Sequence, residues 1–245
     1  MSSMKDETIE RVRQETGDWQ YMQDLPGEWH GFSLDRTAAI GKDMYTLYRY
    51  FNEELHKSVT VYFHEETNEY KVCLKIGLIE FCRIEFITPS LSVFEDLLNK
   101  QFDQLLLDMV EFNPKTLSSI AHDKGITTWE VGKKLPETLE GFTLYIHPAQ
   151  PVKINNGSYI IIDYVDFSLE SSFTVYYNIY RDEFFAEARI WNIPDVNYDF
   201  DSNELTELEI KLRERLRPRL QQVRDWAEQQ AAAQQKQAEK ETRNA

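Results

Sequence analysis

One segment of the chain occurs twice, and the predicted fold rests on it. Residues 19–34 read WQYMQDLPGEWHGFSL, and residues 129–144 read WEVGKKLPETLEGFTL. Both copies fit the pattern W-x5-L-P-x4-G-F-[ST]-L, in which a short helix ends at a proline and a strand begins at the phenylalanine. This repetition predicts that the chain is a tandem duplication of one folding unit.

The apolar positions that follow the repeated stretch also recur. From Tyr45 onward, an offset of 114 aligns the two copies without a gap, so that VTVYF at 59–63 matches FTVYY at 173–177. A closing helix in each copy has apolar residues every three or four positions, which places them on one stripe against the sheet. The predicted fold is α+β, with an α-α-β-β-β-β-β-α order in each copy and antiparallel sheets that carry helices on one face.

The repeats also define the expected domains. The first repeat covers residues 1–112 and the second covers residues 113–228. Residues 229–245 form a polar tail rich in glutamine and alanine, for which we expect a helical or disordered, solvated segment.

Composition and charge restrict the partners. The formal net charge is −15, and residues 1–113 account for two thirds of it, with 11 basic and 21 acidic residues. Such a surface repels phosphate backbones, so nucleic acid is not an expected partner. No apolar run has the length of a membrane helix, and the N-terminus has no secretory signal pattern. We therefore expect a cytoplasmic protein without a membrane partner.

Histidines and nucleophiles show no catalytic pattern. The five histidines lack metal-ligand spacing, and the chain has neither a G-x-S-x-G elbow nor a phosphate-binding glycine loop. Cys73 and Cys82 fall on adjacent predicted strands, where we favour reduced core thiols over a disulfide. The sequence predicts no catalytic residue, no metal site and no cofactor, and the protein is not expected to be an enzyme.

Five residues are candidates for a ligand- or partner-binding site. Asp163 lies inside an apolar run, and its counterpart in the first copy is Arg49. If the repeats pack about a pseudo-twofold axis, these two residues form a structural ion pair or face a shared cleft. Tyr48, Tyr50 and Tyr164 belong to strands that are aromatic on both faces. One face has to meet the helices, and the other is either buried between the repeats or marks a contact surface.

Residues 117–135 allow two further interpretations. Ala121, Gly125 and Val131 occupy helix-turn-helix positions, although a helical packing unit is favoured over DNA binding. A segment of about 25 residues also resembles the N-terminal helical module of haem-utilisation carriers. The matching residues are Asn113, Pro114, Thr116, Leu117, Ile120, Ala121, Gly125, Glu130, Val131, Leu135 and Pro136. The resemblance implies a β-rich domain after the module. No histidine in the following strands matches a haem-binding motif of that family.

The leading functional hypothesis is a non-catalytic binding protein. Its expected partner is another protein, for which the acidic surface favours a basic one, and it contacts the groove between the repeats or an aromatic sheet face. The alternative is a carrier of a small ligand or tetrapyrrole in the cleft between the repeats. An enzyme that uses Arg49 and Asp163 is the third hypothesis. The sequence does not determine the oligomeric state.

Overall fold

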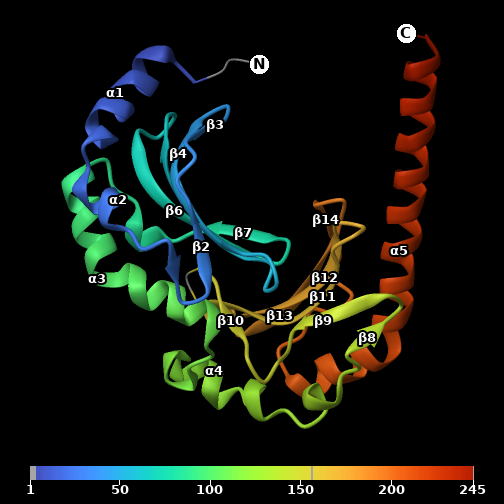
Figure 1. The fold of residues 1–245 in the computed structure, drawn as a ribbon. Helices are drawn as coiled ribbons and strands as arrows, with labels where there is room; N and C mark the ends of the chain where they lie inside the picture. The colour runs from blue at the N-terminus through green and yellow to red at the C-terminus, as the bar shows by residue number, and fades with distance from the viewer. Residues whose placement is uncertain (1–3, 156, 245) are drawn as a thin grey trace. The chain divides into compact units, whose positions relative to one another are not determined.

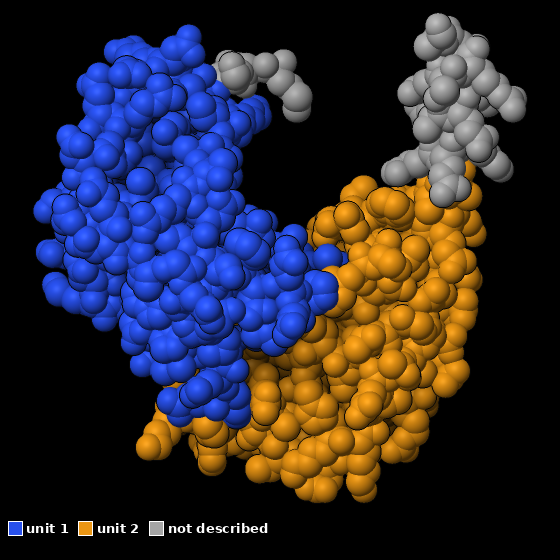
Figure 2. All heavy atoms as spheres, viewed as in Figure 1, with its two compact units in different colours: residues 1–113 blue, residues 114–245 orange. Residues whose placement is uncertain are grey.

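The computed structural model describes residues 4–155 and 157–244, and for residues 234–244 it describes the backbone only. The chain divides into two compact units, residues 1–113 and 114–245 (Figure 2). Within the described residues, each unit combines helices with one antiparallel sheet of seven strands (Figure 1). The predicted α+β class with antiparallel sheets is therefore confirmed.

Unit 1 begins with two helices, carries its sheet in the middle and ends with a long helix. The helices are α1 (Asp6–Gly17), α2 (Gln20–Asp24) and α3 (Leu91–Val110). The strands are β1 (Glu28–Trp29), β2 (Phe32–Asp35), β3 (Ala39–Ile40), β4 (Met44–Asn52), β5 (Lys57–His64), β6 (Glu69–Ile76) and β7 (Ile79–Cys82). Their order in the sheet is β1-β2-β4-β5-β6-β7, and β3 pairs with β4.

The three helices of unit 1 lie on one face of its sheet (Figure 1). Helix α3 begins after Ser90, whose hydroxyl accepts a hydrogen bond from the Val93 amide and so caps the helix. Its fully buried Phe94 and Phe102 contact rings of the sheet, with Phe94 stacked 5.5 Å from the Tyr70 ring. Aromatic packing of this kind makes the helix-facing side of the sheet the core of unit 1.

Unit 2 has the same sheet topology. Its α-helices are α4 (Ser119–Asp123) and α5 (Leu205–Asn244). The strands are β8 (Thr138–Leu139), β9 (Phe142–Ile146), β10 (Val152–Lys153), β11 (Ser158–Asp166), β12 (Ser171–Asn178), β13 (Glu183–Ile190) and β14 (Ile193–Val196). The order is β14-β13-β12-β11-β9-β8, and β10 pairs with β11.

Helix α5 covers the core face of the second sheet, where it contacts β12 and β13. One stripe of this helix is buried, and it consists of Leu208, Leu212, Leu216, Leu220, Val223 and Ala227. The spacing of three or four residues keeps the stripe on one side, as the sequence pattern predicts. The helix continues through Pro218 and on to Asn244, beyond the last residue of the buried stripe.

The repeated stretch builds a tight hairpin in each unit. His30 and Gly31 join β1 to β2 with φ values of 49° and 79°, and Glu140 and Gly141 join β8 to β9 with 50° and 81°. Two successive left-handed residues are the geometry of a type I′ turn, which explains the glycine that both copies share. At Gly141 a side chain would also collide with the guanidinium group of Arg224.

The structure corrects three details of the prediction. Each sheet has seven strands instead of five, because the short strands β1, β3, β8 and β10 are added. The alternation of Cys82, Ile84 and Phe86 predicts a strand, but Ile84–Phe86 is a 3-10 helix that turns the chain so that Phe86 enters the core. The predicted helix at 129–134 is replaced by 3-10 turns at Ile126–Thr128 and Gly132–Lys134. Trp129 between them has an extended backbone.

No helix in the described part of the chain combines the length and the apolar character that a membrane span requires.

Candidate functional site

The three candidate tyrosines lie in the cores of their units. Tyr48, Tyr50 and Tyr164 are each 0% exposed. The Tyr50 hydroxyl donates to the carbonyl of Pro26 at 2.6 Å, and the Tyr164 hydroxyl donates to the carbonyl of Pro136 at 2.7 Å. These hydroxyls therefore hold the repeated stretch against the sheet. Their rings offer no surface to a partner, so a binding surface has to be sought elsewhere.

Arg49 lies on the opposite, open face of the first sheet. A bulge between Thr46 and Tyr48 shifts the alternation of β4, so that Tyr48 and Tyr50 face the helices while Arg49 faces away from them. Strand register aligns Arg49 with Asp35 on one side and with Thr60 on the other. Thr60 is in turn aligned with Cys73, and Cys73 with Cys82. The open face thus carries a polar row across five strands.

A cavity of about 370 Å³ lies over this row. Nine of its ten lining residues carry polar side chains, and all come from unit 1: Asp35, Thr37, Ala39, Thr46, Arg49, Ser58, Thr60, Cys73, Lys75 and Glu80. Lys75 and Glu80 are aligned with each other in a neighbouring row, two residues along β6 and β7 from Cys73 and Cys82. Arg49 is therefore one wall of a formed cavity and not an isolated surface charge.

The carboxylates of this cavity have hydrogen-bond partners, whereas its cations do not. Asp35 accepts a hydrogen bond from the Thr37 amide at 2.8 Å, which lowers the pKa of the carboxyl. Glu80 accepts one from the Cys73 thiol at 3.3 Å. Among the described residues, the guanidinium of Arg49 and the ammonium of Lys75 form neither an ion pair nor a hydrogen bond. Arg49 instead lies 5.6 Å from the centre of the Phe51 ring.

The two cysteines form a close pair at the edge of the cavity. The Arg83 amide donates to the Val72 carbonyl at 2.9 Å, so Cys73 and Cys82 are a non-hydrogen-bonded pair, the type with the shorter Cα separation. Both are free thiols, and Cys82 Sγ lies 3.1 Å from the Tyr62 hydroxyl. The Cys73 thiol lowers the pKa of Cys82 to about 6, and the same contact, together with burial, raises the pKa of Cys73.

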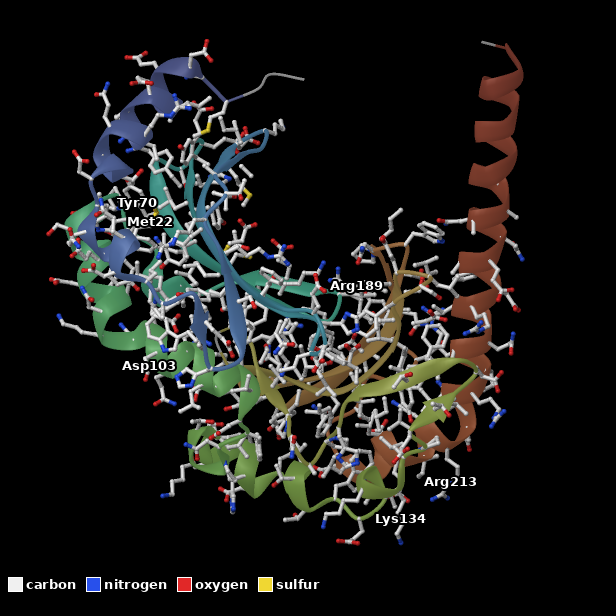
Figure 3. The ribbon with its side chains drawn as sticks, viewed as in Figure 1. Met22, Tyr70, Asp103, Lys134, Arg189 and Arg213 are labelled. Atoms are coloured by element: carbon white, nitrogen blue, oxygen red, sulfur yellow. The ribbon has the colours of Figure 1, made fainter. Side chains whose placement is uncertain are left out.

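Asp163 occupies the position in the second sheet that corresponds to Arg49. It is 0% exposed, and its Oδ1 accepts a hydrogen bond from the Thr174 hydroxyl at 2.7 Å. Its Oδ2 has no hydrogen-bond partner within the described residues. Burial raises the pKa of Asp163 to about 7, against the smaller opposing effects of Thr174 and of the Arg189 charge. Arg189, labelled in Figure 3, forms an ion pair with Glu187 at 2.9 Å.

The predicted pairing of Arg49 with Asp163 stays a prediction. Each residue has its own neighbours within its own unit, Asp35 and Thr60 for Arg49, and Thr174 for Asp163. Over the part of the chain that the structure describes, no group of three or more histidine, cysteine or acidic side chains is arranged to hold a metal ion.

Sequence analysis did not identify Lys75, Glu80 and Thr60 as members of the site. The available signal was the period of two along a predicted hairpin, which places Cys73 and Lys75 on one face. Neither a family model, nor a curated protein, nor a solved structure matches the chain. We therefore infer function from the side chains themselves.

Proposed function

We propose that the protein is a non-catalytic binding protein that takes a small molecule with an anionic group, a carboxylate or a phosphate, on the open face of its first sheet. The observation that carries this proposal is the pair of cations Arg49 and Lys75, which among the described residues form neither an ion pair nor a hydrogen bond, in a cavity whose carboxylates accept hydrogen bonds. Guanidinium and ammonium groups that lack a partner bind anions through charge-assisted hydrogen bonds. The free thiols fit the cytoplasm as the place of action.

The spacing of the sheet allows both cations to reach one anion. Neighbouring strands are about 5 Å apart, and two residues along a strand span about 7 Å. Arg49 and Lys75 are two strands and two residues apart, with Ser58 and Thr60 between them. Long side chains from both ends therefore reach over the two hydroxyls, which supply further hydrogen bonds. The cavity volume of about 370 Å³ falls in the lower range of small-molecule sites.

The chemistry of the cavity favours binding over catalysis. The thiol inside it, Cys73, has a raised pKa and is therefore a poor nucleophile at neutral pH. Arg49 keeps its charge at every physiological pH and neither gives nor takes a proton. An anion held here meets fixed positive charge on a protein whose formal net charge is −15. Because the net charge of the protein repels anions, the binding of an anion depends on the cations of the cavity.

Titration calorimetry with succinate, citrate, inorganic phosphate and glycerol phosphate tests the proposal. We expect at least one of these anions to bind, and we expect Arg49→Gln and Lys75→Gln each to weaken binding about tenfold or more, the worth of one charge-assisted hydrogen bond. Arg13→Gln is the matched control, because it removes the same charge from the exposed surface of α1. Absence of binding by all four anions, or full affinity in both cavity variants, would refute the proposal.

A protein partner is the second candidate, and an exposed apolar edge favours it. Strand β14 ends the second sheet, and near it Ile193 is 62% exposed, Val196 60% and Tyr198 81%. The counterpart of Ile193 in unit 1, Ile79, is only 5% exposed. Unpaired sheet edges with apolar side chains are sites where another chain adds a strand.

A pull-down from native extract at low and high salt tests this second candidate. We expect a partner whose capture is lost in Ile193→Ser and in Tyr198→Ser, and retained in the control Ile40→Ser, which removes an exposed apolar side chain from unit 1. Retention in all three variants would exclude the β14 edge. The short resemblance to haem carriers is tested separately by haem titration, where a shift of the Soret band would support a tetrapyrrole ligand.

We also infer that the two units arose by tandem duplication. The repeated stretch supports this, as do the shared strand order, the equivalent bulges in β4 and β11 and the equivalent tyrosine–proline hydrogen bonds. Superposition of the two units over residues aligned at an offset of 114 in a crystal of the full chain would support the inference. A different chain path in one of the units would contradict it.

A further inference from the structure

A second cavity lies within unit 2, between the 3-10 turn Gly132–Lys134 and helix α5. Its volume is about 280 Å³, and most of its lining is apolar, with Trp129, Leu135, Leu139, Leu212 and Leu216 among its walls. Cationic side chains also border it, and Figure 3 shows two of them, Lys134 and Arg213, at the same end of the unit. An apolar interior with charge at its border is the arrangement that an amphipathic molecule requires.

Unit 1 fills the corresponding space with larger side chains. At four aligned positions unit 1 has Tyr21, Met22, Trp29 and Phe102. At the same positions unit 2 has Val131, Gly132, Leu139 and Leu216. In unit 1 the Trp29 and Phe102 rings pack 5.6 Å apart. The cavity in unit 2 is therefore the space that smaller side chains leave at this point of the fold.

Gly132 is required for the shape of this cavity. A Cβ atom at this position would lie 2.4 Å from a ring carbon of Trp129, so any larger residue would displace the tryptophan. Trp129 is itself held in place, because its indole N–H reaches Glu209 on α5 at 3.5 Å. The absence of a side chain at Gly132 thus leaves the Trp129 ring in place as one wall of the cavity.

The charge at this place also differs between the units. Asp24, Asn99 and Asp103 of unit 1 align with Lys134, Arg213 and Arg217 of unit 2. Asp103 is engaged in unit 1, where it contacts His30 at 2.7 Å and accepts from the Trp29 indole at 2.9 Å.

In unit 2 two of the three cations are already paired, Arg213 with Glu209 at 2.8 Å and Arg217 with Glu140. Among the described residues, the ammonium group of Lys134 has no ion pair and no hydrogen bond. It is therefore the cation that is left to meet a ligand.

We propose that this cavity binds a small amphipathic carboxylate, with its apolar body against Trp129 and Leu216 and its carboxylate on Lys134. The site is independent of the anion site of unit 1. The apolar lining selects the body of the ligand, because each buried methylene group increases affinity about fourfold until the cavity is full. The ammonium of Lys134 selects the anionic head over a hydroxyl.

Calorimetric titration of the full chain with butanoate, hexanoate, octanoate and decanoate tests the proposal, with octanol as the uncharged comparison. We expect affinity to rise with chain length and then level off, and octanoate to bind at least tenfold more tightly than octanol. Lys134→Gln should remove the preference for octanoate. Lys133→Gln should retain it, because Lys133 is already paired with Glu130 at 2.7 Å.

Two variants fill the cavity with side chains that unit 1 uses. Leu216→Phe and Val131→Tyr should each lower octanoate affinity tenfold or more, and having two variants keeps the test valid if one fails to fold. Unaltered octanoate affinity in a folded filling variant would overturn the proposal. So would octanol binding as tightly as octanoate. Anion binding in unit 1 is measured separately with Arg49→Gln, so the failure of one site leaves the other testable.

Discussion

At the positions where unit 1 has Arg49 and Phe102, unit 2 has Asp163 and Leu216. Both units keep the same strand order and the same hydrogen bond from a tyrosine to the proline carbonyl of the repeated stretch. The scaffold therefore constrains neither the charge at this position of β4 and β11 nor the size of the side chains under the last helix. Residues that the units share therefore maintain the fold, whereas residues that differ create the two cavities.

The greatest loss of stability is expected from truncating a buried side chain under the last helix, and it should differ between the two units. Phe102 is fully buried against the rings of Trp29, Tyr48 and Tyr50 at 5.6–6.0 Å. We expect Phe102→Ala to destabilise unit 1 by about 3–5 kcal/mol, the usual loss for a buried phenylalanine. Leu216→Ala should destabilise unit 2 by about 2 kcal/mol, at the low end for leucine, because Leu216 already borders a cavity.

Hydrogen exchange resolved by peptide measures each unit separately in the full chain. Faster exchange confined to unit 1 in Phe102→Ala, and to unit 2 in Leu216→Ala, is the expected result. An equal loss of stability in the two variants would contradict the prediction, because it would show that Leu216 is packed as tightly in unit 2 as Phe102 is in unit 1.

The next effect concerns the buried charge of unit 2. The pKa of Asp163 is raised from 3.8 to about 7, so the folded state favours the protonated carboxyl. The stability that this proton gives is complete below pH 3.8 and is lost as the pH rises through 7. Asparagine stays neutral at every pH. The free energy of unfolding of Asp163→Asn should therefore rise relative to that of the wild type between pH 4 and 8, by up to about 4 kcal/mol.

Urea unfolding at a series of pH values measures this gain. Arg49→Asn is the comparison in unit 1, and it should show no such pH dependence, because the guanidinium is charged throughout the range. A pH profile of Asp163→Asn that parallels the wild type would mean that Asp163 is ionised in the folded protein.

The smallest effect tests what the units share. Tyr50→Phe and Tyr164→Phe each remove a hydroxyl that donates to a proline carbonyl, at 2.6 and 2.7 Å. We expect each substitution to cost about 1 kcal/mol, the net worth of one such hydrogen bond. Thermal unfolding of the two variants should give equal shifts. A large shift in one variant only would show that the repeated stretch is anchored differently in the two units.

The hydrophobic pattern predicted the elements better than it predicted their faces. The stripe on α5 and the hairpins followed directly from spacings of three or four and of two. Strict alternation places aromatic residues on both faces of β4, which made Tyr48 and Tyr50 candidates either for burial or for a contact surface. The bulge at Thr46–Tyr48 cancels that alternation, and the bulge depends on hydrogen bonding to β5, which no local pattern records.

The site residues divide in the same way. Asp163 stood out in the sequence because a charge interrupts an apolar run, and Arg49 because it is the aligned residue of the first copy. In the structure Arg49 lines the cavity of unit 1, whereas Asp163 is a buried carboxyl in unit 2. Lys75, Glu80 and Thr60 lie on other strands, and only strand register brings them to Arg49. The cavity of unit 2 was equally hidden, since its walls come from residues about 80 positions apart, such as Trp129 and Glu209.

The α+β class and the antiparallel hairpins follow from the order of residues alone, because periodicity, a helix-ending proline and a turn glycine act through neighbouring residues. Distant packing fixes which tyrosines are buried, which cations of the described residues form no ion pair or hydrogen bond, and where smaller side chains leave a cavity. Those properties depend on what lies across the sheet or on the facing helix. These contacts join segments that are far apart in the sequence, so no local pattern of residues predicts them.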